Sequence, residues 1–395
     1  MTLSREGTYQ GGRRVLLVTV GGEGRPDGED VMTARTTTAA LAAVCAPLLV
    51  LAPPASALPS AEPDVVAEGL VGALALSVAH DGTAYVAEQM AGRLTAVAPD
   101  GTTRTVTEGP VGGVDATGRG TLTVTLSAPP EGGADASFSV ARVDHKGRTR
   151  ELASLLAHEE ATNPDAVNTY GFVGGSPACL ASAAPFGFDG YTGIVESNPY
   201  AVLLRRSDRV VADAAGNSIV RVVANGRTST VAVLPPVEVA FTEELRQALL
   251  AQLPPEEQLP PDTLLACVGS TYSGEPVPTD VELGPDGAYY VSSLPGFPEA
   301  PGTGAVFRVD PRTGDVERLH EGFSGAVDLA VADDGTVYVA ELFAGLLTRV
   351  APDGSRESVP LDSPGAVEVD RDGAVWVTTG VFGPGGQLLR YDSWD

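Results

Sequence analysis

The side chains in this chain that could do chemistry are carboxylates and amides rather than nucleophiles. The 395 residues contain no Gly-x-Ser-x-Gly, no His-Glu-x-x-His and no phosphate-binding glycine loop. The nucleophile elbow, the zinc-protease helix and the nucleotide-binding loop are therefore missing. None of the four histidines pairs with another at the spacing of metal ligands, and we interpret them as surface residues: His80, His145, His158 and His320.

Oxygen-bearing side chains recur instead at the ends of short apolar runs. Carboxylate and amide oxygens are the ligands that Ca²⁺ takes in proteins, and a bound Ca²⁺ can polarise a substrate as a Lewis acid. The competing interpretation is structural, because Asp and Asn also hydrogen-bond the backbone at strand ends and turns. The candidate ligand-binding or metal-binding residues are Glu88, Asn198, Asp213, Asn217, Asp280, Asp328 and Glu341.

An internal repeat predicts the elements that carry these residues. Residues 81–101 (DGTAYVAEQMAGRLTAVAPDG) align without a gap with residues 334–354 (DGTVYVAELFAGLLTRVAPDG). Apolar alternation indicates short strands, and Asp-Gly is typical of a tight hairpin turn. Repeats of about 40 residues with four short strands each indicate the blades of an all-β propeller.

We predict six blades, with seven as the alternative because the second repeat is irregular. The last repeat holds only three strands, while Asp64–Glu68 forms a spare strand near the other end of the chain. We expect Val65 and Val66 to pair with the strand around Leu388–Tyr391, which closes the ring and covers an open sheet edge. The predicted blades are 70–108, 111–156, 197–234, 277–321, 325–361 and 365–392.

Two insertions, 157–196 and 235–276, interrupt the repeat. Each lies between the last strand of one blade and the first strand of the next, so both are expected on one face of the disc. The second contains an amphipathic helix, TEELRQALLAQL, with Thr242 as its N-cap. Inner strands start, and second strands end, on this same face, so the candidate oxygen ligands are expected there too.

Each insertion also contributes one cysteine and several aromatic residues. Cys179 and Cys267 lie in neighbouring loops, and in an oxidising compartment they predict a disulfide; the alternatives are two free buried thiols or a nucleophilic cysteine. We call the face that carries the two insertions the capped face. A ligand-binding propeller would present an open aromatic groove on it. The residues expected to line that groove are Phe186, Phe188, Tyr191 and Phe297.

Seven motifs give the chain a resemblance to the ScyD/ScyE family of exported propellers, which are relatives of NHL-type propellers. They are SNPY at 197–200, VADAAGN at 211–217, VPTDV at 277–281, GPDG at 284–287, GFP at 296–298, FRVDP at 307–311 and GAVD at 325–328. The resemblance spans about residues 65–392. It implies export and a propeller fold, and it brings no catalytic residues with it.

An export signal precedes the repeats. Residues 39–52 form a short apolar run, which Pro53-Pro54 and then Ala55-Ser56-Ala57 follow, so 32–57 is predicted to be a signal peptide cleaved before Leu58. Residues 1–31 are interpreted as a disordered upstream extension, and 58–395 as the secreted propeller, without a membrane span. A net charge of −26 argues against nucleic acid and anionic membranes as partners.

Two functions of different class remain open. The first is a non-catalytic, monomeric propeller that binds a small ligand or a protein partner on its capped face. The alternative is a calcium-dependent lactone or ester hydrolase of the gluconolactonase-like type. The Glu-Gly-Pro-x-Trp segment of gluconolactonase relatives is missing from the sequence, so whether the protein is an enzyme stays undecided.

Overall fold

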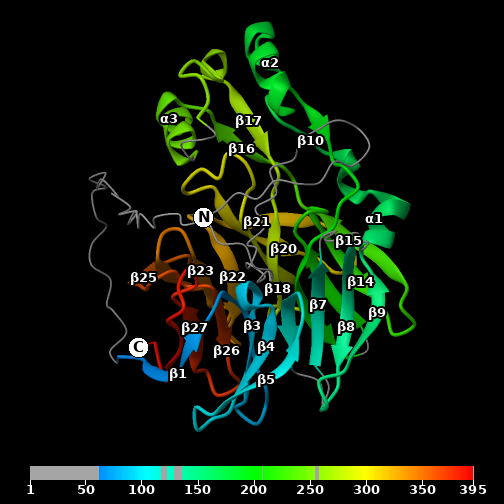
Figure 1. Ribbon diagram of the computed structural model, residues 1–395, viewed down its shortest axis with the longest axis vertical. Coiled ribbons are helices and arrows are strands. Elements are labelled where there is room, and N and C mark those ends of the chain that lie inside the picture. Colours follow the sequence, from blue (N-terminus) through cyan, green and yellow to red (C-terminus); the bar gives the residue numbers. More distant parts are fainter. Residues whose placement is uncertain (1–61, 117–121, 129–135, 207, 254–257, 395) are drawn as a thin grey trace, which may run out of the picture.

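The computed structural model describes residues 62–116, 122–128, 136–206, 208–253 and 258–394. Within these ranges, six antiparallel four-stranded sheets form the blades of a β-propeller (Figure 1). Their inner strands neighbour one another in a closed ring, and the last inner strand contacts the first. The prediction of six blades is confirmed. The predicted signal peptide, 32–57, and the segment 1–31 lie outside the described residues.

Each of the first three blades runs outward from the central axis in chain order. Blade 1 comprises β2 (Ala73–Val78), β3 (Ala84–Glu88), β4 (Arg93–Val97) and β5 (Thr103–Glu108). Blade 2 comprises β6 (Val111–Asp115), β7 (Leu122–Ala128), β8 (Ser137–Val143) and β9 (Thr149–Ser154). Blade 3 comprises β12 (Pro199–Arg205), β13 (Asp208–Asp213), β14 (Ser218–Val222) and β15 (Thr228–Val233).

The last three blades complete the ring, and the sixth takes its outer strand from the other end of the described chain. Blade 4 comprises β18 (Pro278–Leu283), β19 (Tyr289–Ser293), β20 (Gly304–Val309) and β21 (Val316–Phe323). Blade 5 comprises β22 (Ala326–Val331), β23 (Val337–Glu341), β24 (Leu346–Val350) and β25 (Arg356–Pro360). Blade 6 comprises β26 (Ala366–Val369), β27 (Val375–Thr379), β28 (Gly386–Tyr391) and β1 (Asp64–Leu70).

The Asp-Gly hairpins behave as their sequence predicts. In blade 1 the Asp81 carboxylate accepts the N–H of Thr83 at 3.0 Å, while Gly82 takes a φ of +81° that side chains disfavour. Hydrogen bonds from Thr83, first that of its backbone N–H, lower the pKa of Asp81. The hydrogen bond within the turn is a sufficient structural reason for an aspartate at this position, so Asp81 does not indicate a ligand site.

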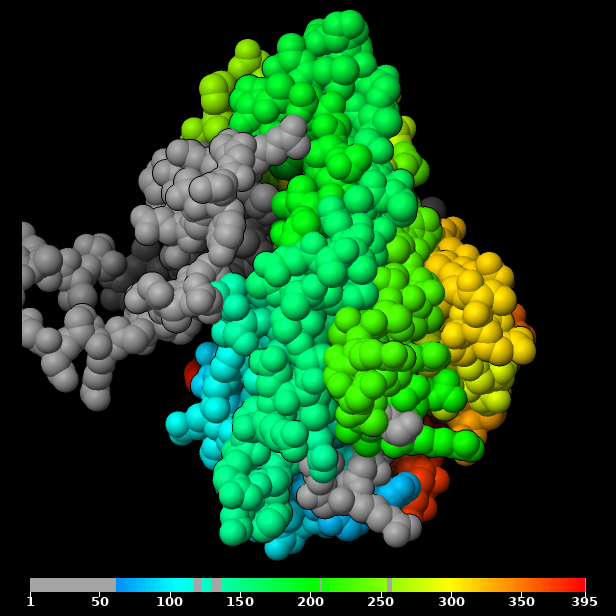
Figure 2. All heavy atoms as spheres, turned by 90° about the vertical axis from the view of Figure 1, so that its right-hand side faces the viewer, coloured from blue at the N-terminus to red at the C-terminus, as the bar shows by residue number. Residues whose placement is uncertain are grey.

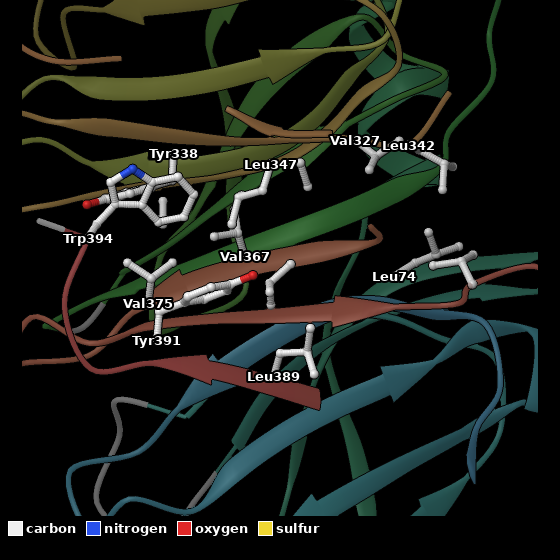
Figure 3. Close-up of a cluster of buried hydrophobic side chains, with 14 residues drawn as sticks. Leu74, Val327, Tyr338, Leu342, Leu347, Val367, Val375, Leu389, Tyr391 and Trp394 are labelled. Atoms are coloured by element: carbon white, nitrogen blue, oxygen red, sulfur yellow. The ribbon is translucent and has the colours of Figure 1, made fainter. Parts of the chain in front are cut away.

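The hydrophobic core lies between neighbouring blades, because each sheet buries both of its faces. Figure 3 shows one such layer, in which Val375, Leu389 and Tyr391 of blade 6 face Leu347 of blade 5. The ring of Trp394 lies 5.5 Å from the rings of Tyr338 and Tyr391, so the C-terminal segment also covers this layer.

The N-terminal strand closes the ring as predicted, except that Val66 lies at a register shift and has no partner in the ladder. β1 pairs antiparallel with β28, with Val65 opposite Leu389 and Ala67 opposite Leu388. Gln387 Nε2 also donates to Glu68 Oε1 at 2.9 Å. Segments more than 300 residues apart therefore share one blade, and β1 rather than β28 is the edge strand.

The two insertions fold together into one unit, which we call the insertion lobe (residues 157–196 and 235–276). It lies beyond the blades at one end of the molecule (Figures 1 and 2). The first insertion forms α1 (Leu156–Thr162), η2 (Pro164–Val167), β10 (Thr169–Tyr170), α2 (Pro177–Ala183), η3 (Ala184–Phe186) and β11 (Tyr191–Thr192). The second forms β16 (Val237–Ala240), α3 (Glu243–Gln252), η5 (Leu265–Cys267) and β17 (Thr271–Gly274).

Covalent and hydrogen bonds join the two halves of the lobe. Cys179 and Cys267 form the predicted disulfide, and a backbone bridge between Gly171 and Ser273 links β10 to β17. The rings of Phe172 and Tyr272 meet edge to face at 4.9 Å in the core of the lobe. The lobe therefore has a hydrophobic core of its own, separate from the cores between blades.

The predicted helix of the second insertion is also confirmed. Thr242 Oγ1 accepts the N–H of Leu245 at 3.2 Å as the N-cap of α3, and Leu245 and Leu249 pack against the core of the lobe. Among the described residues, no helix has the length and apolar character needed to cross a membrane.

Candidate functional site

The seven candidate oxygen ligands do not gather at one point; they divide among three places in the propeller. Glu88 and Glu341 end the second strands of blades 1 and 5. Each accepts a backbone N–H from the segment before its own inner strand, Val71 for Glu88 (2.8 Å) and Ser324 for Glu341 (2.7 Å). These two glutamates therefore fasten chain segments within a blade.

A threonine completes each of these networks, and in blade 1 an arginine joins it. Thr95 donates to Glu88 and Thr348 to Glu341, both at 2.5 Å. Arg93 adds a two-pronged ion pair to Glu88, with both contacts at 2.7 Å. Glu88 is thus fully engaged by the protein itself.

Asp280 and Asp328 lie in the central channel, where they connect neighbouring blades. Asp280 accepts the N–H of Leu329 in blade 5 at 3.3 Å, and Asp328 accepts that of Val367 in blade 6 at 2.9 Å. Asp115 does the same between blades 2 and 3, with Leu204 at 2.5 Å. An inner-strand aspartate therefore satisfies a backbone donor of the next inner strand at three blade boundaries.

Two glutamates add to the negative charge of the channel. Glu282 and Glu368 line the same narrow cavity as Asp280 and Asp328. Burial, and then the neighbouring carboxylates, raise the pKa of both glutamates and of Asp328 well above the usual range. Burial raises the pKa of Asp280 to about 7. The cavity measures about 10 Å³, which is room for roughly one water molecule, so no substrate fits inside it.

Asn198, Asp213 and Asn217 form the third group, on the face of blade 3 that meets the insertion lobe. Asp213 is fully buried and accepts the N–H of Asn198 at 2.7 Å and the hydroxyl of Ser197 at 2.6 Å. Asn217 donates to Asp165 of the lobe at 2.9 Å and accepts the N–H of Val277 at 3.1 Å. These residues hold the start of blade 3 and connect it to the lobe.

Beside Asp213 lies a cluster of acidic residues that the sequence did not predict. Burial, and then the nearby charges of Asp213 and Asp165, raise the pKa of Glu159 to about 9. Burial, and then the charge of Glu275, raise the pKa of Glu196 to about 8. Burial is also the main reason why the pKa values of Asp165, Asp213 and Glu275 are raised. We call Glu159, Asp165, Glu196, Asp213 and Glu275 the acid cluster.

The four aromatic groove candidates pack on one another and on the core of the lobe. Phe188 stacks on Phe297 with ring centroids 4.2 Å apart, and Phe186 stacks on Phe188 at 6.2 Å. The hydroxyl of Tyr191 donates to Glu275 at 2.7 Å. All four side chains are partly buried. Phe297 belongs to blade 4, so this stack fixes the lobe to that blade.

A larger groove lies on the opposite face, among the hairpin turns of blades 1 and 6. It measures about 580 Å³, within the range of small-molecule sites. Its lining is mainly polar, and its one tryptophan is already engaged: Trp376 Nε1 donates to Asp370 at 2.9 Å, and the Arg390 guanidinium lies 5.5 Å from the ring centroid.

Sequence reasoning could have found the channel glutamates but not the acid cluster. Asp280 and Glu282 alternate along an inner strand, and in a strand that spacing places both on one face. Glu159 and Asp165 lie in an insertion without a repeat, so no pattern connects them to blade 3. Among the described residues, no three His, Cys, Asp or Glu side chains are arranged to hold one metal ion.

Comparison with solved structures identifies the architecture. A putative oxidoreductase (glucose dehydrogenase) from Thermus thermophilus matches with a TM-score of 0.52 and 17% identity, over 83% of this chain and 99% of that chain. A gluconolactonase from Xanthomonas campestris matches with a TM-score of 0.50 and 13% identity, over 84% and 90% of the two chains. A further glucose dehydrogenase matches with a TM-score of 0.51 and 14% identity, over 84% and 100%.

The chain is a six-bladed β-propeller. At these identities the likeness shows the fold alone. No family model matches the sequence, and no curated protein matches it.

Proposed function

We propose that this propeller is exported, as the resemblance to ScyD/ScyE proteins implies, and that it binds a small ligand or a protein partner through its capped face. The capped face carries the insertion lobe and the loops between the second and third strands of the blades. The binding surface is apolar, and the acidic groups beneath it serve to hold the lobe in place.

The distribution of exposed apolar side chains supports this proposal. Eight of the ten large apolar residues exposed in the described part of the chain belong to the capped face. Large apolar side chains that gather on one face indicate an interaction surface. The eight are Val167, Val173, Ile194, Val195, Leu259, Leu265, Phe343 and Phe382.

Phe343 and Phe382 are the strongest evidence for a binding surface, because they belong to the blades and not to the insertion lobe. Phe343 is 47% exposed in the loop between β23 and β24, and Phe382 is 59% exposed in the loop between β27 and β28. The corresponding turn of blade 1 carries Met90, which packs against a core between blades. An exposed aromatic ring adds little to folding but much to binding.

Site-specific photo-crosslinking tests the proposal. A photoreactive phenylalanine analogue is placed at Phe343 or Phe382 and, as the matched control, at Leu283, which is 38% exposed at the far end of an inner strand. Irradiation of the exporting culture should give one discrete adduct from positions 343 and 382 and none from 283. Equal labelling at all three positions, or no adduct at any, would overturn the proposal.

The hydrolase alternative is supported by the fold that the chain shares with the gluconolactonase from Xanthomonas campestris. The purified mature protein can be assayed with gluconolactone by acid release, with Ca²⁺ and with chelator. Hydrolysis that is faster than the spontaneous rate and depends on Ca²⁺ would favour this alternative over the binding protein.

A further inference from the structure

The most unusual polar group in the described residues is the carboxylate of Glu159. The residue is 0% exposed, and neither of its oxygens has a hydrogen-bond partner. Asp165, six residues further on, is 1% exposed and its Oδ1 has no partner either. The amide oxygen of Asn163, which lies between the two residues in sequence, is also buried without a partner. Buried polar oxygens without partners are costly and indicate a missing cationic or donor group.

Two glycines make room for these carboxylates. A Cβ at Gly216 would stand 2.5 Å from Glu159 Oε1 and 3.3 Å from the carboxyl carbon of Asp213. A Cβ at Gly193 would stand 2.0 Å from Asp165 Oδ1. Gly216 thus leaves space for Glu159 beside Asp213, and Gly193 leaves space for Asp165, because a side chain at either glycine would clash with these carboxylates.

Basic side chains do not balance this charge. None of the ion pairs formed by the described residues includes a member of the acid cluster. Asp213 and Glu196 increase the negative charge around Glu159. Asp213 itself is held by Ser197, Asn198 and Gly216, so it contributes charge from a fixed position.

We propose that Glu159, Asp165 and Asn163 bind one calcium ion, with Asp213 as a further counter-charge. The donor set consists of two carboxylates and an amide oxygen, which are hard ligands that suit Ca²⁺. Ca²⁺ also tolerates irregular geometry with added backbone and water oxygens, whereas Mg²⁺ requires a near-ideal octahedron.

The ion would act as a structural clamp. Glu159 lies in the first turn of α1, Asn163 is the C-cap of that helix, and Asp165 follows in η2. Asp213 and Gly216 belong to blade 3. An ion between them would fix the lobe to blade 3, much as the aromatic stack of Phe188 and Phe297 fixes it to blade 4. This role does not depend on what the capped face binds.

Calcium titration of the mature protein after chelation tests the proposal, read by thermal melting and by equilibrium dialysis. The parent should bind one Ca²⁺ and melt higher by about 4 °C at a hundredfold excess over Kd, with a smaller effect of Mg²⁺. Glu159→Gln should fold, because it replaces a buried carboxyl group by an isosteric amide, and it should lose both the dialysis signal and the melting shift.

The control variant is Glu282→Gln in the central channel. It removes a carboxylic acid from the channel, which is the second place where buried acidic residues gather, and it should leave Ca²⁺ binding unchanged. Absence of Ca²⁺ binding in the parent would show that protons or buried water satisfy Glu159, and would overturn the proposal. Loss of binding in Glu282→Gln together with retention in Glu159→Gln would place the ion in the channel and would equally overturn it.

Discussion

The carboxylate of Asp328 in blade 5 accepts the backbone N–H of Val367 in blade 6 at 2.9 Å. Both residues are buried, so the bond crosses a blade boundary without competition from water. This hydrogen bond gives Asp328, which lines the central channel, a structural role in joining two blades. It also makes the role of Asp328 testable separately from any ligand.

Replacing Asp328 by two different residues should separate its hydrogen bond from its charge. Asp328→Asn keeps an acceptor for Val367 and removes a charge that burial and Asp280 disfavour, so stability at pH 8 should stay equal or rise. Asp328→Ala leaves the buried N–H without a partner and should cost about 1–3 kcal/mol. Chemical denaturation of both variants measures the difference. Equal destabilisation by Asn and Ala would contradict the hydrogen-bond role.

The channel acids also predict a direction for the pH dependence of stability. Burial raises the pKa of Asp280 to about 7, whereas the pKa of an aspartate in the unfolded chain is about 3.9. The folded state therefore holds the proton more tightly, and the free energy of unfolding should fall as the pH rises from about 4 through 7. Asp280→Asn should reduce this slope, as measured by denaturation at pH 5, 6, 7 and 8. A parent whose stability rises over that interval would refute the assignment.

Glu88 and Glu341 occupy equivalent positions but should differ in their contribution to stability. Only Glu88 carries an arginine, and the side chain of Arg93 is 38% exposed, so solvent weakens that ion pair. We expect Glu88→Gln to cost about 1–2 kcal/mol and Glu341→Gln less, because the amide oxygen can still accept the N–H of Ser324 while the amide NH2 can donate to the hydroxyl oxygen of Thr348. Urea denaturation compares the two. A larger loss in Glu341→Gln would show that the arginine is not what distinguishes them.

Ring closure by β1 predicts the effect of shortening the N-terminus. Removing residues 58–68 deletes most of β1, exposes β28 as an unprotected edge and uncovers apolar residues of blade 6. The shortened chain should lose several kcal/mol of stability and aggregate more readily. Removing only 58–63, which ends before β1 begins, is the matched control and should leave the melting temperature unchanged. An equal effect of the two deletions would show that pairing is not responsible.

The disulfide should stabilise the insertion lobe more than the blades. It closes an 88-residue separation, and chain-entropy arguments give such a link a few kcal/mol. In the Cys179→Ser, Cys267→Ser double variant, amide exchange should accelerate in α2, η5 and β17, while the inner strands stay protected. Exchange followed by mass spectrometry tests this. Uniform acceleration over lobe and blades would mean that the two unfold together.

Much of the fold follows from the sequence alone. The repeated Asp-Gly turns and the alternating apolar residues define strands locally, because each hairpin is specified by neighbouring residues. The missing strand of blade 6 and the spare segment Asp64–Glu68 predicted their pairing, and two cysteines in adjacent insertions predicted their bond. Each of these inferences needed only a local pattern or a count.

The arrangement of the acidic residues was decided by the tertiary structure. The candidate oxygens all lie near strand ends, yet a strand end can face the channel, the start of its own blade or the lobe. The neighbours in the folded protein determine which of these places a side chain occupies. Asp328 binds Val367 in the channel, Glu88 binds Arg93 within its own blade, and Asn217 binds Asp165 of the lobe. The acid cluster joins Glu159 of an insertion to Asp213 of a blade. It forms only when the insertion packs on the propeller, and such packing between distant segments leaves no periodic signal in the chain.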